Sequence, residues 1–193
     1  MKIVLASGNR HKYTEMKEAL EKIGIELLFG GDFENAIEVE ENGKSYEENA
    51  LLKAKAWAEM TGLPAMSDDS GIEVDALNGK PGIHSARIVP GSDNDRIKWM
   101  LTQLKDKTNR NAHFVSCIVV VFNDGRENII CQKKCEGKIT EKISGNTGFG
   151  YDPIFIPTGY EKTFAELGDE IKRKISHRAL AIKGLAEKLK VMI

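Results

Sequence analysis

The first segment whose residue types suggest chemistry is Ser7-Gly8-Asn9-x-x-Lys12, directly after an apolar run at residues 2–6. The run is typical of a short buried strand and the residues behind it of a helix, so backbone N–H groups and the positive end of a helix dipole would converge there. Gly8 would let the backbone approach a ligand, and Lys12 adds a cation. The segment predicts a phosphate site. It is not a Walker loop, because G-x-x-x-x-G-K-[ST] does not occur in the chain. The simpler interpretation is a turn capped by Asn9.

Two pairs of acidic residues could hold a hard metal ion. Glu40 and Glu41 precede a predicted helix, and Asp68 and Asp69 are expected at the end of a strand over residues 63–66, where open α/β sheets bind ligands. Successive strand residues point to opposite faces, so Asp68 and Asp69 should not both face one site. One aspartate with one glutamate would suit Mg²⁺, which takes one or two carboxylates plus phosphate oxygens and waters. The simpler interpretations are a solvated loop for the glutamates and a turn at Asp69.

Lys53 lies in the helix behind the glutamates, four residues after Asn49 and on the same helix face. Small neighbours such as Ala50 and Ala54 would let a ligand approach. Nothing in the sequence distinguishes Lys53 from a solvated lysine such as Lys55.

The stretch from Gly145 to Pro153 is the most unusual in composition, with glycines at 145, 148 and 150. Glycines at these positions bend the backbone and expose its N–H and C=O groups. Phe149 and Tyr151 would offer flat faces on which a base could stack, and a long surface turn is the alternative.

Lys172 and the sequence Ser176-His177-Arg178 complete the candidates. With Ser176 as N-cap, His177 and Arg178 fall in the first helical turn, where cations oppose the helix dipole. Residues that break a local rule are functional suspects, although side chains that simply point to solvent are the alternative.

The apolar spacing predicts alternating strands and helices early in the chain and a long hairpin later. This pattern predicts an α/β fold with a mixed central sheet, flanking helices and a central cleft, formed by one domain over residues 1–193. The expected elements are strands at 2–6, 25–29, 63–66 and 72–76, helices behind Asn9, Ser45 and Ser92, a hairpin of 112–122 and 126–135, and a last helix behind Ser176.

The composition excludes several classes of protein. The chain has 193 residues, with 28 Lys+Arg against 29 Asp+Glu and a formal net charge of −1. This balance argues against a general nucleic-acid-binding surface and still allows a basic pocket for a small polyanion. No apolar run approaches the ~20 residues that span a bilayer, and no signal peptide is visible. Three cysteines are an odd and sparse set for a disulfide framework. We therefore expect a cytoplasmic protein with free thiols and with neither nucleic acid nor membrane as partner.

The order and spacing of these motifs resemble one family along essentially the whole chain. It is the inosine triphosphate pyrophosphatase family, also called the Ham1 family. The matching blocks are Ser7-Gly8-Asn9-x-x-Lys12, Ser45-Tyr46-Glu47-Glu48-Asn49-Ala50 with Lys53, Asp68-Asp69-Ser70-Gly71, Pro81-Gly82-x-x-Ser85-Ala86-Arg87, Phe149-Gly150-Tyr151-Asp152-Pro153 and Ser176-His177-Arg178.

The resemblance implies an ITPase-like α/β fold of two lobes around a long central sheet, with the substrate in the cleft between them. It also implies Mg²⁺-dependent hydrolysis of ITP, dITP, XTP and related purine triphosphates to the monophosphate and pyrophosphate, with Mn²⁺ as a possible substitute, by an enzyme that is usually a homodimer. It makes Asp69 the general base or metal-bound activator of water, and Glu41 or its neighbour Glu40 the second metal ligand. Residues 7–12, Lys53 and Ser70 would bind the phosphates. The nucleoside contacts would be Phe149, Gly150, Tyr151, Asp152, Lys172, His177 and Arg178.

Two other functions remain open at this stage. A Maf-type nucleotide pyrophosphatase has a similar architecture but a different base preference, and Ser176-His177-Arg178 together with Phe149 to Pro153 favours the first family. A nucleotide-sensing module would bind without turnover, and the intact Asp69 with an acidic partner argues against it.

Overall fold

The computed structural model describes residues 1–192. Its strands form a mixed sheet in the order β2-β1-β3-β5-β6-β7, with β4 paired to β3. β1 runs parallel to β2 and β3, whereas β4 is antiparallel to β3 and β7 to β6. This confirms the predicted mixed sheet with flanking helices. The strands are β1 (Lys2–Leu5), β2 (Glu26–Phe29), β3 (Ala65–Val74), β4 (Pro81–Gly82), β5 (Asn111–Val121), β6 (Ile129–Ile139) and β7 (Phe155–Pro157).

The chain divides into two compact units. Within the described residues, the first comprises Met1–Asp69, Ser116–Lys133 and residues 178–192, and the second comprises Ser70–Val115 and Lys134–His177. The long strands β3, β5 and β6 contribute residues to both units. A single domain over the whole chain stays a prediction.

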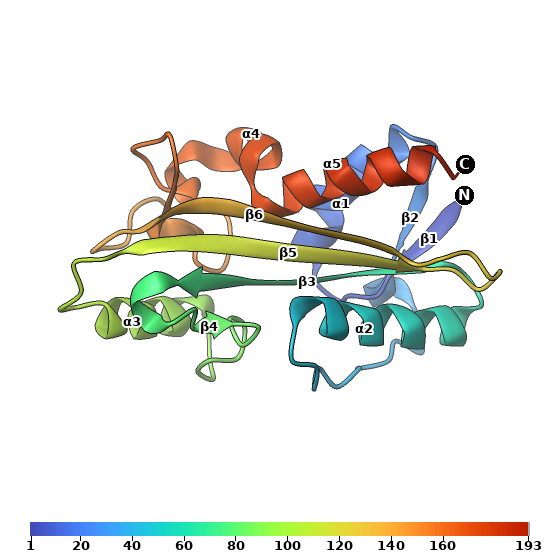
Figure 1. Cartoon of the computed structure of the whole chain (residues 1–193), viewed down its shortest axis with the longest axis horizontal. Helices are drawn as coiled ribbons and strands as arrows, with labels where there is room; N and C mark the ends of the chain where they lie inside the picture. The colour runs from blue at the N-terminus through green and yellow to red at the C-terminus, as the bar shows by residue number, and fades with distance from the viewer. Residues whose placement is uncertain (193) are drawn as a thin grey trace. The chain divides into compact units, whose positions relative to one another are not determined.

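In the first unit, α1 (Arg10–Glu21) and α5 (His177–Lys190) lie on one face of the strands and α2 (Tyr46–Thr61) on the other (Figure 1). Side chains of β1 alternate between these faces, and Ile3 and Leu5 share a core with Met16 of α1 and Leu185 of α5. α2 begins as predicted behind Ser45, whose hydroxyl accepts the Glu48 N–H.

The second unit is built around α3 (Asp93–Gln103) and α4 (Phe164–Ile175), with a 3₁₀ turn at Asp152–Ile154. α3 begins behind Ser92 with a complete capping box to Asp95, as the sequence predicts. Its core joins Met100 of α3 to aromatic rings that include Phe114, Phe155 and Phe164.

Three expectations about the elements were wrong or incomplete. Residues 63–66 and 72–76 were expected to be separate strands, but one strand, β3, runs from Ala65 to Val74. Asp68 and Asp69 therefore lie inside a strand, neither at its end nor in a turn. The hairpin exists, but β6 starts only at Ile129, because Asp124 binds the main-chain and side-chain N–H groups of Arg126 and lengthens the turn. α4 was not foreseen, and Gly168 interrupts its helical backbone with a φ of 76°.

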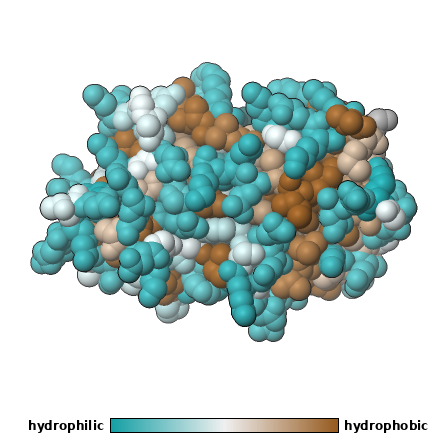
Figure 2. Space-filling model, in the orientation of Figure 1, coloured by the Kyte–Doolittle hydropathy of each residue, from teal (hydrophilic) through white to brown (hydrophobic). Residues whose placement is uncertain are grey.

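The apolar residues are mostly inside the two cores. Figure 2 shows that hydrophilic side chains cover most of the visible face and that hydrophobic residues form smaller groups. The three cysteines are buried free thiols, as the sequence predicts. Large hydrophobic side chains that remain exposed are Ile37, Leu52, Ile143, Tyr160 and Val191.

Candidate active site

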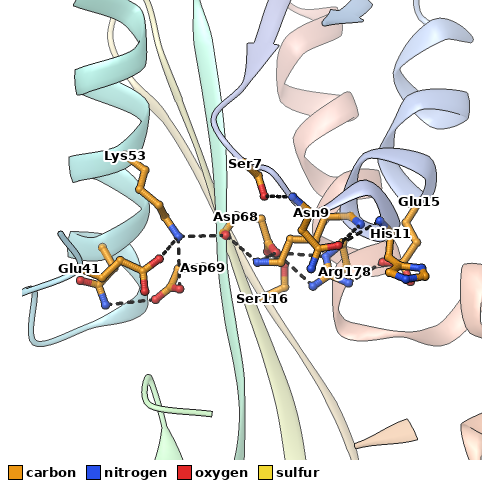
Figure 3. Close-up of polar contacts among 12 residues, drawn as sticks. Ser7, Asn9, His11, Glu15, Glu41, Lys53, Asp68, Asp69, Ser116 and Arg178 are labelled. Atoms are coloured by element: carbon orange, nitrogen blue, oxygen red, sulfur yellow. Dashed lines mark hydrogen bonds and ion pairs between the residues drawn. The ribbon is translucent and has the colours of Figure 1, made fainter. Parts of the chain in front are cut away.

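The predicted phosphate segment forms a capped helix start. The Asn9 side chain accepts hydrogen bonds from the N–H groups of His11 and Lys12, and Ser7 Oγ accepts the N–H of Asn9 (Figure 3). The capping role considered for Asn9 is confirmed. A Cβ added to Gly8 would meet no atom within 4 Å. Packing therefore does not require glycine at position 8, and the space beside it is open.

Asp68 and Asp69 point to different groups, as strand alternation predicts (Figure 3). The Asp68 carboxylate is fully buried, and its Oδ2 lies 2.9 Å from Lys12 Nζ and 3.1 Å from Arg178 Nε. Ser116 of β5 donates to Oδ1 at 2.5 Å. The main-chain oxygen of Asp68 also accepts from Lys12 at 3.0 Å and from Lys53 at 3.4 Å.

Opposite charges compensate for the burial of this cluster. Burial would raise the pKa of Asp68, but Arg178, Lys12 and the Ser116 hydroxyl outweigh it and hold that pKa well below its usual range. Burial lowers the pKa of Lys12 against the opposing effect of Asp68. Arg178 Nη1 also donates to Glu15 Oε2 at 2.5 Å, and the two carboxylates outweigh burial and raise the Arg178 pKa. The cluster holds two cations against two anions.

Asp69 belongs to a second group. Its Oδ1 lies 3.5 Å from Lys53 Nζ, and the same ammonium lies 2.5 Å from Glu41 Oε1. Burial raises the pKa of Asp69, and Glu41 adds to the rise while Lys53 opposes it. A carboxylate with a raised pKa is a better proton acceptor than an ordinary aspartate. Of the two candidate glutamates, Glu41 is half-buried at this group and Glu40 is exposed.

Asn49 joins the parts of this second group. It is fully buried on α2, and its amide Nδ2 donates to Asp69 Oδ2 at 3.3 Å. Its Oδ1 accepts the N–H of Gly43, two residues after Glu41, at 2.9 Å. Asn49 thus connects the loop that carries Glu41 to Asp69. Ser70, the next residue of β3, is half-buried.

In the second unit, the glycine-rich stretch wraps around Asp152. Gly148 and Gly150 have φ values of 79° and 62°, and a Cβ at Gly148 would meet Asp152 Oδ2 at 2.2 Å. Asp152 Oδ2 accepts the Phe149 N–H at 2.9 Å and the Lys172 ammonium at 2.7 Å. The buried carboxylate organises this turn.

The two aromatic rings in this stretch have different surroundings. Lys172 Nζ lies 4.0 Å from the centre of the half-buried Phe149 ring. The Tyr151 ring, in contrast, is buried in the core, with its hydroxyl bound to the Ser85 carbonyl at 2.9 Å. The expectation that Tyr151 offers a stacking face was wrong, because its ring fills the core of this unit.

The predicted helix start behind Ser176 is confirmed, but its cations do not point to solvent. His177 is buried and stacks on Phe114, with ring centres 4.7 Å apart and planes at 11°. Arg178 is buried on Asp68 and Glu15, which offset the unfavourable position of a cation in the first turn.

Sequence reasoning missed Glu15 and Ser116 and gave Asp68 no partners. Two signals existed. Glu15 is three residues from Lys12 on α1, which places both on one helix face. Ser116 is a polar residue inside the apolar strand run of β5.

Among residues 1–192, no three or more His, Cys, Asp or Glu side chains are grouped as they would be to hold a metal ion. No helix among these residues is long and apolar enough to cross a membrane.

Comparison with known proteins gives consistent matches along the chain. The "dITP/XTP pyrophosphatase" of Symbiobacterium thermophilum is 44% identical over 194 residues, covering 100% of this chain and 96% of that protein. The protein of the same name from Aquifex aeolicus is 42% identical and covers 98% of this chain and 97% of its own length.

Solved structures agree with the sequence comparison. The Staphylococcus aureus Ham1 protein matches with a TM-score of 0.90 at 37% identity, covering 100% of both chains. A HAM1 protein from Coxiella burnetii matches with a TM-score of 0.91 at 38% identity and covers 99% of both chains. The model of the Ham1 family matches residues 3–188. The sequence, the mixed sheet and the family match agree, and this chain belongs to the Ham1 family.

Proposed function

We propose that the chain hydrolyses non-canonical purine nucleoside triphosphates, namely ITP, dITP and XTP, to the nucleoside monophosphate and pyrophosphate. The relatives named dITP/XTP pyrophosphatase, which align over nearly all of the chain, support a nucleoside triphosphate pyrophosphatase. The single observation that carries the mechanism is the meeting of Asp69 and Glu41 at Lys53 in the first unit, with Lys12 bound to the adjacent Asp68.

A divalent cation fits the pair Glu41 and Asp69. Both carboxylates meet at one ammonium, Lys53 Nζ, so two oxygen ligands converge where a positive charge is already accommodated. Proteins usually contribute one or two carboxylates to Mg²⁺, whose other ligands are phosphate oxygens and waters. When bound, the cation would neutralise charge on the triphosphate, and Mn²⁺ could replace Mg²⁺ because its ligand preference is the same. We assign Glu41 in preference to the exposed Glu40.

Residues of the first unit and Ser70, which follows Asp69 in the chain, supply the rest of the reaction. Asp69 accepts a proton from water as the water oxygen forms a bond to the α-phosphorus. The bond from that phosphorus to the α–β bridging oxygen breaks, and pyrophosphate leaves with the electron pair. Lys12 and Lys53 hold the phosphates, together with Ser70 and the backbone at Ser7 to Asn9. Phosphoryl transfer depends mainly on such positioning and on compensation of charge.

For the nucleoside we propose Phe149, Gly150, Tyr151, Asp152, Lys172 and His177 among the residues of the second unit. Among those of the first unit, we propose Arg178. The Phe149 ring provides an aromatic face, and Asp152 fixes the Lys172 ammonium beside it. Asp68 and Glu15 fix the plane of the Arg178 guanidinium. Arg178 carries only donors, which suits the 6-keto group of hypoxanthine and xanthine and disfavours the 6-amino group of adenine.

The cellular setting and assembly are part of the same proposal. We infer a cytoplasmic homodimer that cleanses the nucleotide pool, with no nucleic acid or membrane partner. The wild-type protein should be assayed with Mg²⁺ and a panel of ITP, XTP, GTP and ATP, with pyrophosphate and orthophosphate measured separately. We expect monophosphate and pyrophosphate from ITP and XTP. Orthophosphate release with accumulation of IDP would contradict the proposed site of attack.

A further inference from the structure

The proposed function gives Asp68 no role toward the phosphates, although it is the most deeply buried acid of the first unit. Its side chain is 0% exposed, while that of Asp69 is 8% exposed. Burying a carboxylate costs free energy unless charges and hydrogen bonds compensate for it. At Asp68 the compensating groups are Lys12, Arg178 and Ser116, and the first of these is a proposed phosphate ligand.

Lys12 is held by two oxygen atoms of this one residue. Its Nζ lies 2.9 Å from Asp68 Oδ2 and 3.0 Å from the Asp68 main-chain oxygen. The Ser116 hydroxyl, from the neighbouring strand β5, binds the other carboxylate oxygen and fixes the rotation of the carboxylate. The ammonium therefore has one defined position, which a flexible lysine stem would not give by itself.

Lys53 provides a contrast inside the same unit. It reaches only the main-chain oxygen of Asp68, at 3.4 Å. Its carboxylate partners are Glu41 and Asp69. A change confined to the Asp68 side chain should therefore affect Lys12 directly and leave the contacts of Lys53 in place.

We propose that Asp68 is a positioning residue that holds the Lys12 ammonium, through its side chain and with Ser116 as support, where the triphosphate binds. The inference rests on the proposed function. A charged side chain that is already held in position strengthens binding, because no free energy is lost in ordering that side chain when the ligand binds. Asp68 does not touch the reacting atoms, and its effect on the reaction passes through Lys12.

A pair of double-mutant cycles tests this directly. KM and kcat for XTP are measured with Mg²⁺ in Asp68→Asn, in Lys12→Met, in Lys53→Met and in the two double variants. Loss of a charge-assisted hydrogen bond should raise KM about tenfold in Asp68→Asn, with kcat within about twofold of wild type. With Lys12 already removed, the same change should alter KM less than about twofold. In the Lys53→Met background, Asp68→Asn should still raise KM about tenfold.

A probe without a base separates Lys12 from Arg178, which Asp68 also contacts. The inhibition constant of inorganic triphosphate should rise in Asp68→Asn by the same factor as KM. If KM rises and this constant does not, Asp68 acts through Arg178 and the inference is wrong. An equal effect of Asp68→Asn in the wild-type and Lys12→Met backgrounds would also overturn it.

Ser116→Ala keeps the test decisive if Asp68→Asn does not fold. This variant removes one hydrogen bond and no charge. We expect KM to rise about threefold when Lys12 is present and to stay unchanged when it is not. No change in KM with Lys12 present would refute the inference. Wild-type pyrophosphate release is measured in the same series, so failure of the proposed function would be seen separately.

Discussion

Asp68 and Asp69 are consecutive residues of β3, and their carboxylates form ion pairs with different lysines. Asp68 Oδ2 lies 2.9 Å from Lys12 Nζ, and Asp69 Oδ1 lies 3.5 Å from Lys53 Nζ. The strand pleat separates a charge-balanced carboxylate, Asp68, from Asp69, which is also buried and whose pKa is raised, first by burial. The two acids therefore suit different tasks, holding a cation and accepting a proton.

Asp69→Asn should fold like the wild type and lose at least about 100-fold in kcat, because the amide cannot accept the proton of water. Steady-state pyrophosphate release and the thermal melting temperature are the measurements. Asp106→Asn, at an exposed position, is the matched control. Retention of more than about a tenth of wild-type kcat, well outside the loss expected for a general base, would remove Asp69 from that role.

Glu41→Gln should raise the Mg²⁺ concentration required for half-maximal activity by about tenfold or more, since one of two carboxylate ligands is lost. Glu40→Gln is the matched control and should leave that concentration unchanged. EDTA should abolish wild-type activity, and added Mg²⁺ should restore it. A larger effect of Glu40→Gln than of Glu41→Gln would reverse the assignment of the ligand.

Asn49→Ala should lower kcat/KM by about tenfold or more, because Asp69 loses a hydrogen bond and the Glu41 loop loses its attachment at Gly43. The Mg²⁺ requirement should rise in the same variant. Activity is titrated with Mg²⁺ in the variant and the wild type. Lower activity at an unchanged Mg²⁺ requirement would show that Asn49 does not position the two carboxylates for the metal ion.

Arg178→Ala should lower the free energy of unfolding by about 3–5 kcal/mol, because Asp68 and Glu15 lose a buried partner. Arg178→Lys keeps the cation and tests base selection with less damage to the fold. In this variant the ratio of kcat/KM for ITP to that for ATP should fall, since a planar set of donors is lost. An unchanged ratio would leave Arg178 a structural role only.

The stability of the protein should fall at alkaline pH partly through Cys117. Burial raises the pKa of this thiol to about 12, above the value of about 8.5 expected in an unfolded chain. The folded state thus favours the protonated thiol, and this contribution to stability is lost as pH rises above about 8.5. Urea unfolding at about pH 8 and about pH 10 should show a smaller loss of stability in Cys117→Ala than in the wild type. Equal losses of stability in the two proteins would show that the Cys117 thiol does not cause the fall.

The sequence by itself determined the features that depend on neighbouring residues. Helix starts behind Asn9, Ser45 and Ser92 follow from a side chain that caps N–H groups two or three residues away. The divergence of Asp68 and Asp69 follows from the twofold repeat of a strand, whatever the strand pairs with. These features needed no knowledge of the rest of the chain.

Only the tertiary structure decided which charged and polar side chains contact one another. Arg178 and Ser116 reach Asp68 from 110 and 48 residues away. Such contacts depend on which strands and helices become neighbours, and local spacing does not encode that. The same limit explains β3, whose Asp-Asp-Ser-Gly sequence resembles a turn. It continues as a strand because its carboxylates are neutralised by lysines and an arginine from α1, α2 and α5.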